Sequence, residues 1–455
     1  MADPWSSSLD VHLGWSPGEG RQSLADAIRA AIRDGRWQPG AAVPSTRALA
    51  HDLGIARGTV TRVYADLAAE GYLLTSQGAP TRVTTAGTRP HPSPSRPATE
   101  PASRWTLRPG QPDLSAFPRD AWSSATRRVM QHAPGEVFGY SEPHGTLALR
   151  EALARYLGRS RGVLADPGRI LVCAGFTHAI SVLSRALLDL GSAELAFEDP
   201  SMWMFRDIAA AAGQRVVGVP VDDDGLQVSK VDSPAVMVTP AHHYPLGVTL
   251  APSRRTALVR SGAMIIEDDY DGEFRFDRQQ VGALQALAPE RVVYAGTASK
   301  TLAPALRLSW LVLPASLVDP VFAAMSASGA RPSVVDQLVL AELLESGAYD
   351  QHVRRCRTEY RRRRDQLVAA LPEHLAVQGI SAGLQLVIRL GCEDEILAEA
   401  RRRSLDLEVL GPHWINQGDR EGGIIVGYAA PAKHAFSATL ATLLATLTEV
   451  TPGSC

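Results

Sequence analysis

The first part of the chain carries apolar residues at helical spacing. They recur every three or four positions in residues 24–32, 49–53 and 60–67, and a glycine follows each stretch. This pattern predicts short helices joined by tight turns. Two helices joined by such a turn form a helix-turn-helix, in which the second helix enters the major groove of DNA. We therefore expect the helix that begins at Arg57 to be a recognition helix.

The DNA contacts are expected at the starts of the second and third helices. The candidates are Ser45, Thr46, Arg47, Arg57, Gly58, Thr59, Thr61 and Arg62. Residues 1–84 contain eight arginines and eight acidic residues, so this segment is neutral as a whole. Within residues 45–65, however, the three arginines face only Asp52, which leaves a net charge of +2. A small helical subdomain with solvated arginines also fits the pattern.

Residues 84–104 hold five prolines and almost no bulky apolar side chain. Such a composition favours an extended, semi-rigid linker over packed structure. A proline-rich ligand for a signalling domain is the alternative. We interpret the segment as a linker between a DNA-binding domain, residues 1–83, and a larger domain, residues 105–455.

After residue 104, helical patterns alternate with short apolar runs. The runs are residues 170–173, 195–197, 215–219, 235–238, 264–266, 292–294 and 310–313. Buried strands separated by helices predict a mostly parallel sheet. We expect a large α/β part to about residue 314 and a smaller α+β part over 315–455. In the latter, the arginine-rich helix at 353–364 is interpreted as a solvated face.

The composition is that of an ordinary globular protein, with 45% hydrophobic and 21% charged residues and a net charge of −2. The four cysteines lack the spacing of a zinc site, and they indicate a reducing compartment. No leader peptide and no long apolar stretch is evident. We expect a cytoplasmic protein without a metal or a membrane partner.

Lys300 stands out because the chain contains only three lysines, the others being Lys230 and Lys433, among 46 lysines and arginines. It follows the apolar run 292–294 and a series of small residues. Arginine replaces lysine at most surface positions here, so a lysine retained after a buried strand suggests a need for an amine that can lose its proton. A Schiff base with an aldehyde cofactor is one use of such an amine.

Residues 267–273 form an acidic cluster directly after the run 264–266. It fits a metal site, a loop of solvated acids, or a carboxylate that pairs with a protonated pyridine nitrogen. In the third case Asp268 would meet the ring nitrogen and Tyr270 a ring hydroxyl, as in pyridoxal-phosphate proteins. A phosphate would then find donors at a helix start and beside the lysine. These donors are Gly175, Phe176, Thr177, Thr297, Ser299 and Arg307.

Two sets of motifs resemble known families. Residues 35–50 (Gly-Arg-Trp-Gln-Pro-Gly-Ala-Ala-Val-Pro-Ser-Thr-Arg-Ala-Leu-Ala) and 53–64 are similar to the winged helix of GntR-family repressors. The expected Gly-rich wing differs, because residues 77–82 read Gln-Gly-Ala-Pro-Thr-Arg. Residues 239–247 (Thr-Pro-Ala-His-His-Tyr-Pro-Leu-Gly), 265–274 and 296–302 resemble the fold-type I aminotransferase domain of MocR-type regulators.

The resemblance implies a winged-helix head joined to an α/β, fold-type I pyridoxal-phosphate-dependent transferase-like domain with a small α+β part. It implies pyridoxal 5'-phosphate as cofactor, Lys300 as its Schiff-base lysine, Asp268 on the pyridine nitrogen, Tyr270 on the ring oxygen and His242 near the ring. The phosphate donors named above would form the cup. A domain-swapped, head-to-tail homodimer that binds two half-sites of double-stranded DNA is implied as well.

Two departures affect the expected function. Met202 stands where relatives carry an aromatic residue, so either Trp203 or Phe176 stacks on the ring instead, or the stacking is weaker. Residues 423–428 (Gly-Ile-Ile-Val-Gly-Tyr) lack the arginine with which aminotransferases hold a substrate carboxylate, and this omits a contact of roughly 1.5–3 kcal/mol.

We therefore expect a transcriptional regulator, not an enzyme, that senses pyridoxal phosphate and controls vitamin B6 biosynthesis genes. One alternative is a regulator with permanent cofactor that senses an amine or amino acid. The other is a working aminotransferase with a vestigial head.

Overall fold

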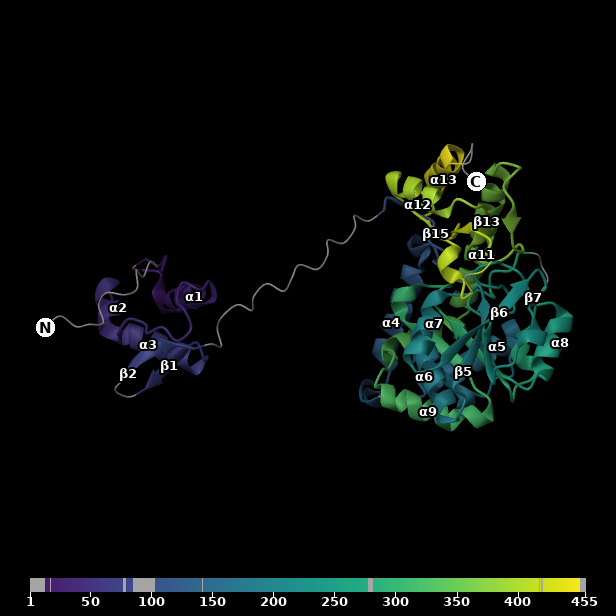
Figure 1. Cartoon of the computed structure of the whole chain (residues 1–455). Helices are drawn as coiled ribbons and strands as arrows, with labels where there is room; N and C mark the ends of the chain where they lie inside the picture. The colour runs from purple at the N-terminus through teal and green to yellow at the C-terminus, as the bar shows by residue number, and fades with distance from the viewer. Residues whose placement is uncertain are drawn as a thin grey trace. The chain divides into compact units, whose positions relative to one another are not determined.

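A computed structural model describes residues 13–16, 18–76, 79–84, 103–140, 142–276, 281–416, 418 and 420–450. The chain separates into an N-terminal unit, Met1–Ala102, and a C-terminal unit, Ser103–Cys455 (Figure 1). Residues 85–102 of the predicted linker lie outside the described part of the chain.

The N-terminal unit has the predicted helices and a following β-hairpin. Its elements are α1 (Gly20–Arg33), α2 (Thr46–Asp52), α3 (Arg57–Ala69), β1 (Leu73–Ser76) and β2 (Ala79–Val83). Ser45 caps α2 by accepting a hydrogen bond from the Ala48 backbone N–H at 3.1 Å. Leu24, Leu49 and Leu67 meet in one core. Burial of each such side chain contributes about 1.5–3 kcal/mol, so the unit has a core of its own.

The C-terminal unit is built on an eight-stranded sheet in the order β4-β11-β10-β9-β8-β5-β6-β7. Its strands are β4 (Ile170–Ala174), β5 (Glu194–Asp199), β6 (Arg215–Asp222), β7 (Gly225–Leu226), β8 (Ala235–Val238), β9 (Met264–Asp268), β10 (Val292–Thr297) and β11 (Leu308–Val312). The neighbours from β10 to β6 are parallel, whereas β11 is antiparallel to both β10 and β4. The predicted mostly parallel sheet is confirmed.

Helices cover both faces of this sheet. They are α4 (Arg119–His132), α5 (Leu147–Arg161), α6 (Phe176–Asp189), α7 (Trp203–Ala211), α8 (Pro252–Arg260), α9 (Ala315–Ser328) and α10 (Val334–Glu345). Alternate residues of one strand enter different cores, since side chains alternate between the faces. Ile170 and Val172 of β4 pack with α5 and α10, whereas Leu171 and Cys173 pack with α6 and α9.

The smaller part combines a four-stranded antiparallel sheet, in the order β12-β13-β16-β15, with the last helices (Figure 1). Its elements are β3 (Trp105–Thr106), α11 (Ala348–Ala370), β12 (Val377–Gln378), β13 (Leu386–Arg389), α12 (Glu393–Arg402), β14 (Leu405–Asp406), β15 (Glu408–Val409), β16 (Gly423–Val426) and α13 (Phe436–Val450). The first segment of the unit joins this part, because β3 pairs with β14.

The arginine-rich stretch of α11 is not uniformly solvated. Arg354, Arg355 and Arg361 are exposed, as the sequence pattern predicts. Arg363, however, is fully buried and donates to the carboxylate of Asp113 at 2.7 Å. The interpretation as a solvated face is therefore wrong for Arg363, which ties α11 to the segment before α4.

Candidate functional site

The carboxyl ends of several strands meet at one edge of the large sheet. Strand β4 runs in the same direction as β10, because each is antiparallel to β11 between them. The residues that follow β4, β5, β8, β9 and β10 therefore lie at the same edge. A cavity of about 210 Å³ opens there, and its lining includes the predicted residues Phe176, Thr177, Asp268, Tyr270, Thr297, Ser299, Lys300 and Arg307. Ligands of α/β sheets commonly bind at this edge.

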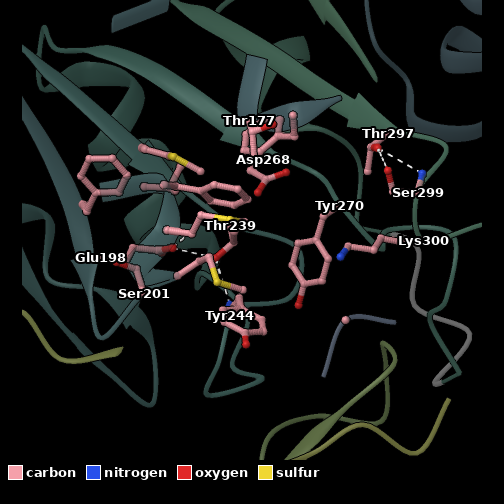
Figure 2. A pocket seen from close by; sticks show the side chains of 18 of the residues that line it. Thr177, Glu198, Ser201, Thr239, Tyr244, Asp268, Tyr270, Thr297, Ser299 and Lys300 are labelled. Atoms are coloured by element: carbon pink, nitrogen blue, oxygen red, sulfur yellow. Dashed lines mark hydrogen bonds between the residues drawn. The ribbon is translucent and has the colours of Figure 1, made fainter. Parts of the chain in front are cut away.

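Lys300 reaches the cavity from the turn after β10 (Figure 2). Burial lowers the pKa of its amine, and the nearby Asp268 opposes this shift. Gly110, at φ 65°, passes close by, because a Cβ at this position would lie 3.1 Å from Lys300 Nζ. The amine therefore stands in a narrow, partly desolvated space, which shifts its protonation equilibrium toward the neutral, nucleophilic form.

Asp268 ends β9 and faces the same cavity (Figure 2). Its pKa is raised well above the usual value by burial, which Lys300 partly offsets. Among the described residues, none donates a hydrogen bond to its carboxyl group. A buried carboxylate without a partner is costly, so the position favours a ligand that brings a cation or a hydrogen-bond donor.

Tyr270 is held by side chains from both parts of the unit. Its hydroxyl accepts a hydrogen bond from Gln385 Nε2 at 2.8 Å and lies 3.1 Å from His242 Nδ1. His242 Nδ1 also lies 2.8 Å from the carboxylate of Asp271, to which it donates when protonated. In that tautomer the Tyr270 hydroxyl keeps its own proton for a ligand. His242 itself does not line the cavity but lies behind Tyr270.

An anion site lies beside these groups, at the start of α6. Gly175 precedes the helix at φ 81°, and a Cβ there would lie 2.6 Å from Arg307 Cζ, so only glycine leaves room for the guanidinium. Arg307 donates to Thr177 Oγ1 and to the Ala174 carbonyl, each at 2.8 Å. It has no carboxylate partner within the described chain. A helix N-terminus with an unneutralised arginine attracts a phosphate.

Thr297 and Ser299 complete this end of the cavity. Thr297 Oγ1 donates to Ser299 Oγ at 3.0 Å and accepts from the Ser299 backbone N–H at 3.1 Å (Figure 2). These bonds fix the turn that leads to Lys300. The sequence-predicted cup residues are thus assembled around the amine.

The other end of the cavity contains residues to which the sequence assigned no role, namely Glu198, Ser201, Thr239 and Tyr244 (Figure 2). Thr239 and Tyr244 nevertheless lie in the motif of residues 239–247. Gln385 was missed as well. Glu198 is the penultimate residue of β5, and Thr239 directly follows β8, its neighbour in the sheet. This position at the end of a buried strand was the available signal. Of the two aromatic residues predicted to stack on a ring, Phe176 lines the cavity, whereas Trp203 is 43% exposed and does not.

The acidic cluster proves to be neither a metal site nor a solvated loop. Asp269 is buried in a bidentate ion pair with Arg161, at 2.6 and 2.9 Å. Glu267 accepts backbone N–H bonds from Leu284 and Gln285. Asp268 and Asp271 are buried too, and Glu273 is half-buried. Over the described ranges, no group of three or more His, Cys, Asp or Glu side chains is arranged to hold a metal ion.

The region of the absent carboxylate arginine is apolar. Strand β16 is buried throughout, and Ile425 pairs with Val387 of β13. In the described part of the chain, Lys300 and Arg307 are the only cationic side chains that line the cavity. The described lining therefore offers an amino-acid carboxylate no further cation.

The N-terminal unit displays a separate candidate site. Arg57, Gly58, Thr61 and Arg62 are exposed at the start of α3, and Thr59 is half-buried. In α2, Arg47 is exposed, and Thr46 accepts a hydrogen bond from Arg57 Nε at 3.3 Å. In the described structure, Arg47, Arg57 and Arg62 form no ion pair. Free guanidinium groups at a helix start suit the phosphate backbone and the base edges of DNA.

Comparisons with known proteins agree with this division. Residues 21–83 match the model of the gntR family of bacterial regulatory proteins, and residues 107–405 match the aminotransferase class I and II model. The chain is 33% identical over 443 residues to a probable rhizopine catabolism regulatory protein, MocR, of Rhizobium meliloti, with 90% of each chain covered. It is 31% identical to the pyridoxine biosynthesis regulator PdxR of Corynebacterium glutamicum, over 90% of this chain and 91% of the relative.

Solved aminotransferases share the fold of the C-terminal unit. An archaeal alanine:glyoxylate aminotransferase superposes with a TM-score of 0.69 at 22% identity, over 76% of this chain and 91% of its own. The α-aminoadipate aminotransferase LysN of Thermus thermophilus, in complex with a phosphopyridoxyl-leucine, gives a TM-score of 0.68 at 21% identity, over 76% and 92%. No helix in the described ranges is long and apolar enough to cross a bilayer.

Proposed function

Because the chain belongs to the aminotransferase class I and II family and carries a gntR-family domain at its N-terminus, we propose that it is a DNA-binding transcriptional regulator that senses pyridoxal 5'-phosphate. One observation carries the proposal: an amine, an unpartnered carboxyl group and an anion-binding helix start line a single cavity. These are the groups that an aldehyde, a pyridine nitrogen and a phosphate require.

The residues present fit this cofactor. Lys300 would hold the aldehyde carbon, Asp268 the ring nitrogen and Tyr270 the ring hydroxyl, with His242 fixing Tyr270. Gly175, Phe176, Thr177, Thr297, Ser299 and Arg307 would surround the phosphate. When bound, pyridoxal phosphate supplies a carbonyl that condenses with an amine and a ring that withdraws electrons. The chain orients these groups and excludes water from the amine.

The cationic side chains favour a sensor over an enzyme. The cofactor occupies both Lys300 and Arg307 in this proposal, so an amino-acid substrate would lose a charge-assisted contact. A ligand domain that binds the cofactor but holds no amino acid responds to the cofactor itself. Since one relative is named for pyridoxine biosynthesis, we infer that the target genes make vitamin B6.

The response is expected at the DNA. We propose a homodimer, domain-swapped and head-to-tail, whose two N-terminal units bind two operator half-sites in the cytoplasm. Arg47, Arg57 and Arg62 would contact the DNA, with Thr46, Gly58, Thr59 and Thr61 beside them and Ser45 as the cap that positions α2. Binding of the cofactor would shift the population of dimers whose spacing matches the operator.

A second candidate keeps the cofactor permanently bound and makes an amine the signal. Two buried polar atoms at the Glu198 end of the cavity, Ser201 Oγ and Tyr244 Oη, lack hydrogen-bond partners among the described residues, and this observation favours a further ligand there.

The lysine assignment can be tested by absorbance. Lys300→Ala should abolish the absorbance band of lysine-bound pyridoxal phosphate, because the other two lysines are exposed. It should leave the operator affinity of the cofactor-free protein unchanged, since the N-terminal unit has its own core. Lys230→Ala, at an exposed position, is the control and should retain the band. A band of full strength in Lys300→Ala would overturn the assignment.

A further inference from the structure

The end of the cavity across from Lys300 has unmet hydrogen-bonding capacity. Glu198 and Ser201 lie on the opposite side of the site from the amine, with Asp268 and Tyr270 between them (Figure 2). Ser201 Oγ and Tyr244 Oη are buried and have no hydrogen-bond partner among the residues that the structure describes. Buried polar atoms normally have a hydrogen-bond partner, because burying one without a partner is costly. A polar group of a ligand is the natural partner here.

Only one of the two carboxyl oxygens of Glu198 accepts hydrogen bonds from the described residues. Its Oε2 accepts from the Thr239 backbone N–H at 2.8 Å and from the Thr239 hydroxyl at 2.7 Å. Within the described residues, Oε1 receives no donor. The carboxyl group is only 4% exposed. It therefore presents an unused acceptor to a cavity from which bulk water is largely excluded.

No cation among the described residues neutralises Glu198. His243 Nε2 lies 3.7 Å from Oε2, but burial lowers the pKa of this histidine to about 3, so it is neutral. Lys300 and Arg307 are engaged by the cofactor under the proposed function. Asp268 is engaged as well, opposite the ring nitrogen. Glu198 is thus the one acidic side chain that the cofactor leaves without a cation among the described lining residues.

The walls around Glu198 are apolar. The apolar residues that line the cavity with Glu198 include Phe197, Met202, Met204, Phe205 and Met237. Alkyl groups pack favourably against such side chains. An anionic group would meet the carboxylate of Glu198 without a compensating cation, and this arrangement is unfavourable.

We propose that the Glu198 end is a subsite for the ammonium group of an aliphatic amine that lacks a carboxylate. Glu198 Oε1 accepts from the ammonium group, and the hydroxyl groups of Ser201 and Tyr244 complete its surroundings. This inference rests on the proposed function, since the cofactor must occupy Lys300 and Arg307. It specifies the class of amine that would be the signal in the second candidate function, in which the cofactor is permanently bound.

The test is titration of the full chain, loaded with pyridoxal phosphate, with 1,4-diaminobutane and 4-aminobutanoate. The two probes share an amine and a chain length and differ in the far group. Calorimetry should give at least about tenfold tighter binding of the diamine, as expected for a charge-assisted hydrogen bond. Equal binding of the two probes would overturn the subsite.

Glu198→Gln is the decisive variant. The amide oxygen can still accept both Thr239 bonds, so the fold and the cofactor absorbance should persist. Affinity for the diamine should fall about tenfold or more, whereas affinity for 4-aminobutanoate should change little. Undiminished diamine binding would show that the ammonium group lies elsewhere.

Two buried serines offer a matched pair of controls. Ser201 and Ser184 both have a buried, unpartnered Oγ, but only Ser201 lines the cavity. Ser201→Ala should weaken diamine binding severalfold and Ser184→Ala should not. Equal effects of the two substitutions would contradict the proposal. If the unaltered protein showed no absorbance band of lysine-bound cofactor, that result would instead count against the proposed function.

Discussion

The two units use charge in opposite ways. The N-terminal unit presents Arg47, Arg57 and Arg62 to solvent, without ion pairs among the described residues. The C-terminal unit encloses Glu198 and Asp268, whose pKa values burial raises, Glu198 to about 7. Exposed charges attract a large polyanion over a distance and are screened by salt. Enclosed charges select a small ligand by contact, and their protonation depends on what is bound.

The difference determines what a substitution can reveal. An exposed arginine contributes little to the free energy of unfolding, so its removal should report on binding alone. A buried carboxyl group affects stability, titration and ligand affinity together. Substitutions in the first unit therefore need a binding measurement, and those in the second also need a pH series.

The largest effect is expected for the double variant Arg57→Ala/Arg62→Ala. Each arginine offers a contact of about 1–3 kcal/mol with DNA, so operator affinity should fall roughly a hundredfold. The slope of log affinity against log salt should also decrease, because fewer counterions are released. Cofactor absorbance should stay unchanged. Arg21→Ala, at the start of α1, is the control and should change operator affinity little. Unchanged operator affinity in the double variant would refute the assignment of α3 as the recognition helix.

The smallest effect is expected in the stability of Glu198→Gln. Burial raises the pKa of Glu198 from 4.5 to about 7, so between these values the folded chain holds a proton that the unfolded chain has lost. The contribution of this group to the free energy of unfolding therefore falls as the pH rises from 4.5 to 7, and is constant above. The neutral amide removes this dependence.

The variant should thus gain stability relative to the unaltered chain as the pH rises. The groups that face Glu198 are Thr239, which donates two bonds, the neutral His243, and Asp268, whose own pKa Glu198 helps to raise. All are common to both proteins, so the difference between their denaturation curves isolates Glu198. A difference that does not change between pH 4.5 and 7 would contradict the raised pKa.

Much of the fold was predictable because its signals are local. The apolar runs after residue 104 are the strands of the large sheet, and the glycine-bounded helical stretches became α1, α2 and α3. The positions of Lys300, Asp268 and Thr177 in one cavity followed from motifs that end parallel strands or begin a helix. Strand ends converge whatever the loops between them contain.

Contacts between distant segments were not predictable. Gln385 reaches Tyr270 from the smaller part across 115 positions. Arg363 is buried because Asp113, far away in sequence, lies opposite. Glu198 resembled any acid at the end of an apolar run, and its unused oxygen becomes visible only when Thr239 is placed beside it. Single-residue patterns do not record such pairings.

The most direct test measures the affinity of the full chain for DNA from upstream of its own gene at increasing concentrations of pyridoxal phosphate. The absorbance of the bound cofactor is followed in the same samples. The account predicts that operator affinity changes in parallel with saturation of the lysine-bound band, and that Lys300→Ala shows neither change. Operator binding that stays constant while the band saturates would contradict the claim that the cofactor is the signal.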